Sequence, residues 1–161
     1  MVREIRGNEI TSNFDKYYLE KAIEAARKRY SDSDFQRPST EVVDGRDGKC
    51  RRLGTESNKQ TRTKRYVFAA IAIKGRGRTS TTGFNSYTKT HPKQKWYSIR
   101  NGESPDRCYT HAEIHALSKS PRADAIYIAR VDRQGSTGLA RPCRACFQAI
   151  SDSGIKKVVY T

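Results

Sequence analysis

Two short stretches of the chain carry side chains whose types and spacing could do chemistry. In the first, His111 and Glu113 stand two positions apart; in the second, Pro142 precedes Cys143 and Cys146, which stand three positions apart. Two thiolates and one imidazole can hold a tetrahedral zinc ion whose fourth position stays open. Water bound there loses a proton near neutral pH and becomes a nucleophile. The pattern predicts that His111, Cys143 and Cys146 bind Zn²⁺, and that Glu113 is the catalytic group that moves protons.

Two alternative readings of these residues are less favoured. A C-x-x-C pair alone is also typical of a redox site or of part of a structural zinc site, but the H-x-E stretch upstream favours the catalytic interpretation. His111 and His115 are four residues apart and could chelate a metal, but Glu113 is misplaced for an H-E-x-x-H site. We expect His115 to pack in the protein interior or to support a metal ligand, and not to bind the metal itself. Cys50 and Cys108 are expected to be free thiols, with a second metal site as the open alternative.

Alternating and helical patterns predict the elements that must position the site. Apolar residues at every fourth position predict an amphipathic helix over 14–30, with Asp15 suited to its first turn. The expected elements after it are strands at 66–73 and 78–84, a helix at 111–117, a strand at 125–131, a helix at 142–153 and a strand at 155–160. A helix between two strands implies a parallel crossover. The order predicts an α/β fold, a three-layer α/β/α sandwich, with both motifs at helix N-termini that favour thiolates.

Three remaining segments lack clear periodicity. Residues 1–12 are expected to be a loose polar arm, and residues 31–64 a long basic loop or insertion. Residues 86–109 are expected to be irregular, with basic and aromatic side chains interleaved as in sites that hold phosphates and stack bases. The length of 161 residues suits one domain, spanning 1–161.

Charge and composition narrow the function classes. The chain is 35% hydrophobic and 30% charged, and no apolar run approaches the length of a membrane span. The N-terminus lacks the apolar segment of a signal peptide, so we expect a cytoplasmic protein. The net charge is +15, and residues 37–107 hold 17 lysines and arginines against 6 acidic residues. This concentration favours a polyanionic partner or a phosphorylated substrate over a merely solvated surface.

The two motifs together resemble those of the cytidine/deoxycytidylate deaminase superfamily. The stretch T-H-A-E-I-H-A-L at 110–117 is also similar to bacterial tRNA adenosine deaminases. The stretches at 89–92, 139–143 and 154–161 resemble short deoxycytidylate deaminase-like proteins encoded by tailed phages, which implies a bacterial or phage-infected host cell. The resemblance covers 14–30 and 66–161 and leaves 31–64 as an insertion. It implies the cytidine deaminase type of α/β/α sandwich and hydrolytic conversion of cytosine to uracil.

The resemblance also implies roles for residues outside the zinc motif. Gly83-Phe84-Asn85 matches the end of the second strand, where an asparagine of the family contacts the sugar. A backbone N–H of Ala112 or Cys143 could steady the reacting groups. His91 could touch substrate or cap a turn, the cations could hold a phosphate, and Trp96 and Tyr97 could stack a base. The substrate-binding candidates are Asn85, Ala112, His91, Lys93, Lys95, Arg100 and Trp96.

Three function classes follow. The first is a deaminase of a free cytidine-type nucleotide such as dCMP, which the resemblance favours. The second is a deaminase of cytosine or adenosine in single-stranded DNA or RNA, which the charge favours. The third is a zinc-containing nucleic-acid-binding module without activity, against which Glu113 argues. The partners implied are a nucleotide or a single-stranded nucleic acid and no membrane, and the resemblance leaves a homo-oligomer open.

Overall fold

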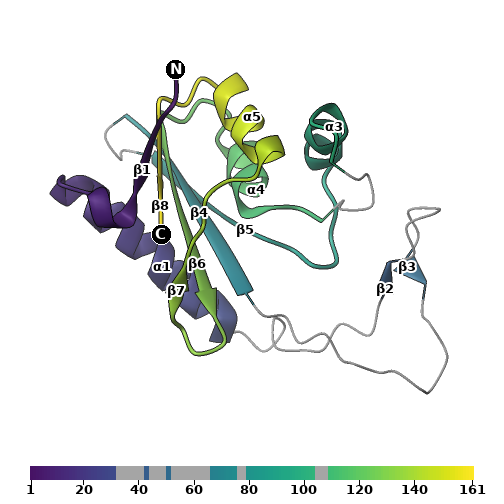
Figure 1. Ribbon diagram of the computed structural model, residues 1–161, viewed down its shortest axis with the longest axis horizontal. Coiled ribbons are helices and arrows are strands. Elements are labelled where there is room, and N and C mark those ends of the chain that lie inside the picture. The colour runs from purple at the N-terminus through teal and green to yellow at the C-terminus, as the bar shows by residue number, and fades with distance from the viewer. Residues whose placement is uncertain (32–41, 44–49, 52–65, 76–78, 104–108) are drawn as a thin grey trace.

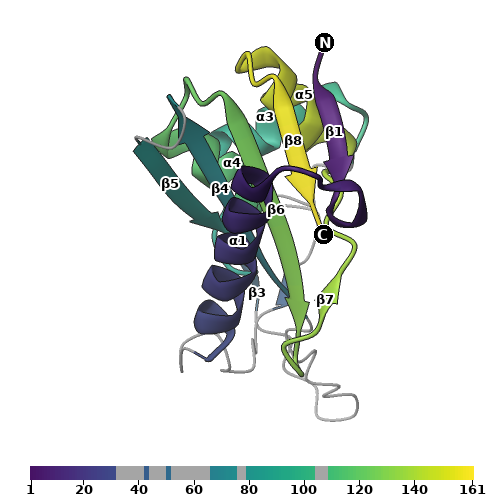
Figure 2. The same cartoon turned by 90° about the vertical axis from the view of Figure 1, so that its left-hand side faces the viewer.

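The computed structural model describes residues 1–31, 42–43, 50–51, 66–75, 79–103 and 109–161 of the chain. A mixed sheet forms the middle layer, with its strands in the order β1-β8-β6-β4-β5 and with β7 paired to one end of β6. The strands are β1 (Arg3–Arg6), β4 (Tyr66–Lys74), β5 (Thr79–Phe84), β6 (Ala125–Asp132), β7 (Thr137–Gly138) and β8 (Lys157–Tyr160). Figure 2 shows the strands side by side across the width of the molecule.

Helices cover both faces of this sheet. Helix α1 (Asn13–Ser31) packs on one face, against β4 and β6. Helix α4 (Ala112–Lys119) packs on the other face with α5 (Arg144–Asp152), and α3 (Pro92–Arg100) lies against α5. Figure 1 shows α1 on one side of the sheet and the other three helices on the opposite side. The predicted three-layer α/β/α sandwich is therefore confirmed.

The side chains of the central strand β4 alternate between two hydrophobic cores, one on each face of the sheet. Along β4, Ala70 and Ala72 point into the core under α4 and α5, whereas Ile71 and Ile73 point into the core under α1. A strand that is buried on both faces reads as one continuous apolar run, which is how residues 66–73 read in the sequence. Strand β4 is antiparallel to β5 and β6, and β6 is parallel to β8 across α5, as the predicted crossover requires.

The prediction of a loose arm at residues 1–12 is wrong. Residues Arg3–Arg6 form β1, which pairs in parallel with the outer edge of β8, and Gly7–Glu9 form a short 3-10 helix, η1. The backbone groups of β8 on that side would otherwise lack partners, and β1 satisfies them. Ile5 and Ile10 add to the core under α1. The strand was missed because it is short and has little apolar alternation.

The prediction of an irregular stretch at residues 86–109 is also wrong in part, because it contains α3. His91 is the N-cap of this helix and accepts a hydrogen bond from the backbone of Lys93, and Pro92 occupies its first turn. The buried side of α3 includes Gln94 and Ser98 beside Tyr97, so its inward face is partly polar and gives no apolar stripe. Helix α5 begins at Arg144, later than the expected 142.

Most of the expected insertion at 31–64 lies outside the described residues. Within it, the structure describes the end of α1 and the antiparallel pair β2 (Val42–Val43) and β3 (Cys50–Arg51). The basic loop and the single-domain organisation therefore stay predictions. Cys108 and the side chain of Cys50 also lie outside the described part of the chain. Among the described helices, none is both long and apolar enough to cross a bilayer.

Candidate active site

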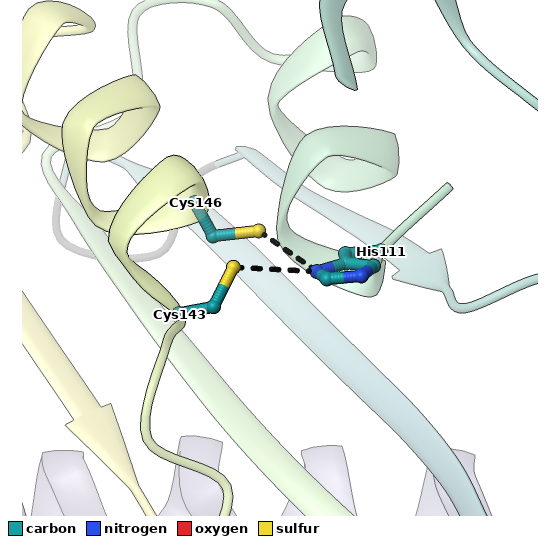
Figure 3. A group of neighbouring side chains, drawn as sticks. All are labelled: His111, Cys143 and Cys146. Carbon is teal, nitrogen blue, oxygen red and sulfur yellow. Dashed lines mark hydrogen bonds between the residues drawn. The ribbon is translucent and has the colours of Figure 1, made fainter. Parts of the chain in front are cut away.

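The three predicted zinc ligands meet between the N-terminal ends of α4 and α5. His111 is the N-cap of α4, Cys143 is the N-cap of α5, and Cys146 lies in the first turn of α5. The Nδ1 atom of His111 lies 3.3 Å from the sulfur of Cys146 and 3.6 Å from the sulfur of Cys143. Figure 3 shows the three side chains pointing toward one another.

The donor set and its spacing fit a zinc ion. The nitrogen and the two sulfur atoms all lie within 4.8 Å of one another. Ordinary Zn–S and Zn–N bond lengths in a tetrahedron place ligand atoms roughly 3.5 Å apart. Among the described residues, this is the one group of histidine, cysteine and acidic side chains close enough to hold a metal. The predicted ligands are therefore brought together as expected.

Electrostatics prepare these residues to bind a cation. Hydrogen bonds from Cys146 and His111 lower the pKa of the Cys143 thiol to about 4, so this residue is a thiolate at neutral pH. The hydrogen bond that Cys146 gives to Cys143, together with burial, raises the pKa of the Cys146 thiol. Burial would lower the pKa of His111, but its hydrogen bond to Cys143 shifts the pKa upward. The positive ends of α4 and α5 also favour negative charge at this point.

Glu113 lies beside this cluster in the first turn of α4. Its side chain is buried, and burial raises the pKa of its carboxyl group. Glu113 lines a cavity of about 390 Å³ together with His111, Ala112 and Cys143. A cavity of this size suits a small-molecule ligand. A metal-ligand cluster, a buried carboxyl group and room for a ligand therefore share one site.

The sequence comparison identifies the family. Residues 47–161 match the family model described as the cytidine and deoxycytidylate deaminase zinc-binding region. The chain belongs to this deaminase family. It therefore carries a zinc-dependent deaminase domain, whose family acts on nucleotides or nucleic acids. The match begins at residue 47 and so includes residues that the predicted resemblance left out, while it does not extend over α1.

The comparisons with solved structures and with curated proteins do not extend this family assignment. A crystal structure of a mutant cytidine deaminase from Mycobacterium tuberculosis shares 24% sequence identity over 60% of this chain and 67% of that chain, with a TM-score of 0.34. No curated protein matches the chain. The family assignment depends on the match over residues 47–161, and the finer resemblance to phage-encoded deaminases stays a prediction.

In this deaminase domain, Asn85 lies where the resemblance expects it. It follows β5 and lines the same cavity as Glu113. Its side-chain Oδ1 accepts a hydrogen bond of 2.8 Å from the backbone N–H of Phe68, which fixes the amide against β4. Two residues earlier, Gly83 packs against α4 so closely that a Cβ atom would stand 2.4 Å from the carbonyl oxygen of Ala112. Only glycine fits there, and this close approach sets Asn85 near the start of α4.

His115 packs as expected rather than binding the metal. Its Nδ1 lies 3.1 Å from the backbone nitrogen of Phe84, so the ring ties α4 to the end of β5. Burial lowers the pKa of this imidazole, with Lys119, His91 and Lys89 adding to the effect. The neutral ring is therefore favoured.

The α3 residues expected to bind substrate do not line the cavity. Lys95, Trp96 and Arg100 are exposed on α3, and the guanidinium of Arg100 lies 4.9 Å from the centre of the Trp96 ring. Lys93 is half-buried on the same helix and is also absent from the described cavity lining. None of these four side chains therefore shares the described cavity lining with Glu113.

Tyr97 in α3 and His91 at the N-cap of α3 both stabilise the structure around this helix. Tyr97 is buried, and its hydroxyl donates a hydrogen bond of 3.1 Å to Asp152 of α5, so its ring is not available to stack a base. The Nδ1 of His91 caps α3 by accepting a hydrogen bond of 3.1 Å from the backbone N–H of Lys93. His91 therefore caps this helix, and contact of His91 with a substrate stays a prediction.

A polar network that we did not predict supports the ligands from α3. The fully buried amide of Gln94 accepts a hydrogen bond of 3.1 Å from the backbone N–H of His111 and donates to Ser98. Ser98 in turn donates to Glu103, whose other oxygen accepts from the backbone N–H of Ala145 in the first turn of α5. The network joins the starts of both ligand-bearing helices. The histidine–proline pair before α3 was the signal that could have revealed this helix.

Proposed function

We propose that this deaminase hydrolyses the cytosine amino group of a free cytidine-type nucleotide such as dCMP, which gives the uracil nucleotide and ammonia. The observation that carries the proposal is the buried Glu113 carboxyl group beside the cluster of His111, Cys143 and Cys146, in a cavity that also contains Asn85. A structural zinc site has no need of a carboxyl group held in this way. The geometry therefore supports catalysis over a binding module without activity.

The proposed roles follow from what each side chain can do. His111, Cys143 and Cys146 would hold zinc, which lowers the pKa of a bound water so that it can act as a nucleophile. Glu113 accepts a proton from the attacking water and donates it to the ring nitrogen of the base. It then takes the second proton from the hydroxyl group added to the amine-bearing carbon and donates it to the amino group, which leaves as ammonia while the carbonyl forms. Its burial keeps bulk water from competing for these protons.

The other groups orient the substrate. The Oδ1 of Asn85 is held by the Phe68 N–H, and the side chain also hydrogen-bonds to Tyr87, which fixes the amide in the cavity wall. Its second amide N–H could donate to a sugar hydroxyl. The backbone N–H of Ala112 or Cys143, each at the N-terminal end of a helix, would steady charge that develops on the base. These positions surround one cavity, so a single bound nucleoside could reach all of them.

A second candidate is a deaminase that acts on cytosine or adenosine within single-stranded DNA or RNA. The surplus of positive charge in residues 37–107 favours it, since a strand offers many phosphates. Much of that segment lies outside the described residues. The family description names cytidine and deoxycytidylate, which is why the free nucleotide ranks first.

A direct assay distinguishes the candidates. Purified zinc-loaded protein is incubated with dCMP, CMP, deoxycytidine and short single-stranded oligonucleotides that contain one cytosine or one adenosine, and products are separated by chromatography. We expect the largest kcat/KM for dCMP, with turnover that depends only weakly on salt because one phosphate releases few counterions. Conversion confined to an oligonucleotide, with binding that falls steeply as salt rises, would replace the first candidate by the second.

A further inference from the structure

The side chain of Gln94 in α3 is fully buried although it is polar. Its Oε1 atom accepts a hydrogen bond of 3.1 Å from the backbone N–H of His111, and its Nε2 atom donates one of 3.3 Å to the hydroxyl of Ser98. Burial of an amide costs free energy unless its polar atoms are paired, so an apolar side chain of the same length would fill this space more simply. The presence of the amide is explained by the group that it binds, which is the backbone of a zinc ligand.

The backbone on both sides of His111 is held by hydrogen bonds. The carbonyl of Thr110, in the same peptide unit as the His111 N–H, accepts a hydrogen bond of 2.9 Å from the backbone N–H of Ser86. The carbonyl of His111 accepts one of 3.0 Å from the backbone N–H of His115 in α4. His111 is the N-cap of α4, so its own N–H lies outside the helical hydrogen bonds, and Gln94 is its acceptor. Both peptide units that flank the Cα atom of His111 are therefore fixed, which sets the direction from which the imidazole reaches the two thiols (Figure 3).

The amide of Gln94 is oriented by a second partner. The His111 N–H can only donate, so the atom of Gln94 that faces it is the oxygen, and the amide nitrogen faces the buried hydroxyl of Ser98. Ser98 is itself held by Glu103, whose backbone N–H donates a hydrogen bond of 2.9 Å to the Ser98 carbonyl. If the amide turned away, both of its bonds would be lost in the protein interior, which is costly. The Gln94 oxygen is thus held in place for His111.

Helix α3 is in turn anchored to α5, the helix that begins with the two thiols. The hydroxyl of Tyr97 donates a hydrogen bond of 3.1 Å to Asp152 near the end of α5. At the start of α5, the carboxylate of Glu103 accepts one of 3.4 Å from the backbone N–H of Ala145. A nitrogen ligand on one helix and two sulfur ligands on another can form one metal site only if the two helices keep their relative position. Gln94 links the backbone of the nitrogen ligand to the helix that is anchored to the sulfur ligands.

We infer that Gln94 is a positioning residue for zinc. By holding the backbone of His111 on α3, it keeps the imidazole aligned with the thiols of α5 and so raises the zinc affinity of the folded protein. Groups that orient metal ligands typically contribute about 10- to 100-fold in affinity. The inference goes beyond the proposed function, because the affinity for zinc does not depend on which substrate is deaminated.

The test compares Gln94→Met with Gln94→Glu. Methionine fills a similar space but has no acceptor for the His111 N–H, whereas glutamate keeps an oxygen at the same place. The zinc dissociation constant is measured by competition with a chromophoric chelator, and we expect it to rise at least about ten-fold in Gln94→Met and to stay within about three-fold of wild type in Gln94→Glu. Wild-type affinity in Gln94→Met would overturn the inference. An equal loss in both variants would also overturn it, because the acceptor oxygen would then not be the cause.

A spectroscopic readout separates positioning from a loss of stability. With Co²⁺ in place of zinc, the visible absorption bands report the geometry of the ligands, and they should change in Gln94→Met but not in Gln94→Glu. Asp15→Ala is the control, because Asp15 is buried on the opposite face of the sheet, where it accepts a hydrogen bond from Tyr127. Its loss should destabilise the fold but keep the wild-type zinc affinity and cobalt spectrum. If Asp15→Ala weakens zinc binding as much as Gln94→Met does, the cause is general instability and the inference fails.

Ser98→Ala replaces Gln94→Met if the latter does not fold. It keeps Gln94 but removes the acceptor that orients its amide, so zinc should pass from the loaded protein to excess chelator about two- to ten-fold faster than in wild type, the scale of one hydrogen bond. Release at the wild-type rate would overturn the inference. None of these measurements uses a substrate, so a failure to deaminate dCMP would contradict the proposed function and leave the role of Gln94 intact.

Discussion

Two buried carboxyl groups, one on each face of the sheet, have equal exposure and opposite surroundings. Asp15 on α1 and Glu113 on α4 are each 5% exposed. Asp15 accepts hydrogen bonds of 2.6 Å from the hydroxyl of Tyr127 and from the ammonium group of Lys157, so its charge is paired. Glu113 has no such cation in contact among the described residues; it lies beside His111 and two thiols, and burial raises its pKa.

The difference shows that burial alone does not indicate what a carboxyl group is for. On the α1 face, the partners of Asp15 come from β6 and β8, so the carboxylate joins the helix to the sheet. On the α4 face, Glu113 lines a cavity, and burial raises the pKa of its carboxyl group. We expect changes on the first face to affect stability and changes on the second to affect zinc and turnover.

The largest effect is expected from loss of a zinc ligand. Cys146→Ala removes a fully buried thiol from the cluster, so the protein should lose most of its zinc, which we expect at about one ion per chain in the wild type. Deamination should fall to background, and folding should be impaired because zinc binding stabilises the folded state. Metal analysis by mass spectrometry after extensive dialysis measures the loss.

A second cysteine provides the control. Cys108→Ala changes a thiol outside the H-x-E and C-x-x-C motifs and should keep the wild-type zinc content and turnover. Stoichiometric zinc in Cys146→Ala would contradict the ligand assignment. Loss of zinc in Cys108→Ala would instead favour the second metal site that the sequence left open.

The next effect in size is expected at Glu113. Glu113→Gln keeps the shape of the side chain but cannot move protons, so kcat should fall by at least ~100-fold, the usual scale for general acid–base groups. Zinc content should stay at the wild-type value, and the free energy of unfolding should not fall, because no ion pair is broken. Turnover, metal analysis and chemical denaturation on the same preparation check all three. Near-normal turnover would mean that another group moves the protons.

The comparison also shows what the sequence could and could not predict. The ligands were predictable because each half of the site is local: His111 and Glu113 in one stretch, Cys143 and Cys146 in another, each at the start of a helix. The central strand β4 was predictable because burial on both faces leaves a continuous apolar run. In these cases, the residues that determine the feature are close together in the chain.

The remaining features depend on partners that are distant in the chain. Strand β1 forms because the edge of β8 needs backbone partners, which side-chain patterns do not reveal. Helix α3 was hidden because its buried face contains Gln94 and Ser98, whose hydrogen-bond partners lie outside the helix. Asp15 lies in the first turn of α1 as expected, but its pairing with Lys157, at the other end of the chain, could not be predicted from the local sequence.

The smallest effect on turnover is expected at Asp15, where the change should appear in stability. Asp15→Ala leaves the hydroxyl of the fully buried Tyr127 without its acceptor, which costs about 1–3 kcal/mol of unfolding free energy. Lys157 adds little, because its side chain is 30% exposed and can turn to water. We therefore expect a loss near ~2 kcal/mol in urea denaturation, with kcat/KM for dCMP within about two-fold of wild type.

Two companion variants identify the cause of this loss. Glu24→Ala on the same helix changes an exposed carboxylate and should stay within about 0.5 kcal/mol of wild type. Tyr127→Phe removes the donor, so Asp15→Ala should destabilise the Tyr127→Phe protein less than it destabilises the wild type. Fully additive losses would show that the hydrogen bond between Asp15 and Tyr127 is not what stabilises α1 on the sheet. A large fall in turnover of the folded Asp15→Ala protein would show that the two faces of the sheet are coupled.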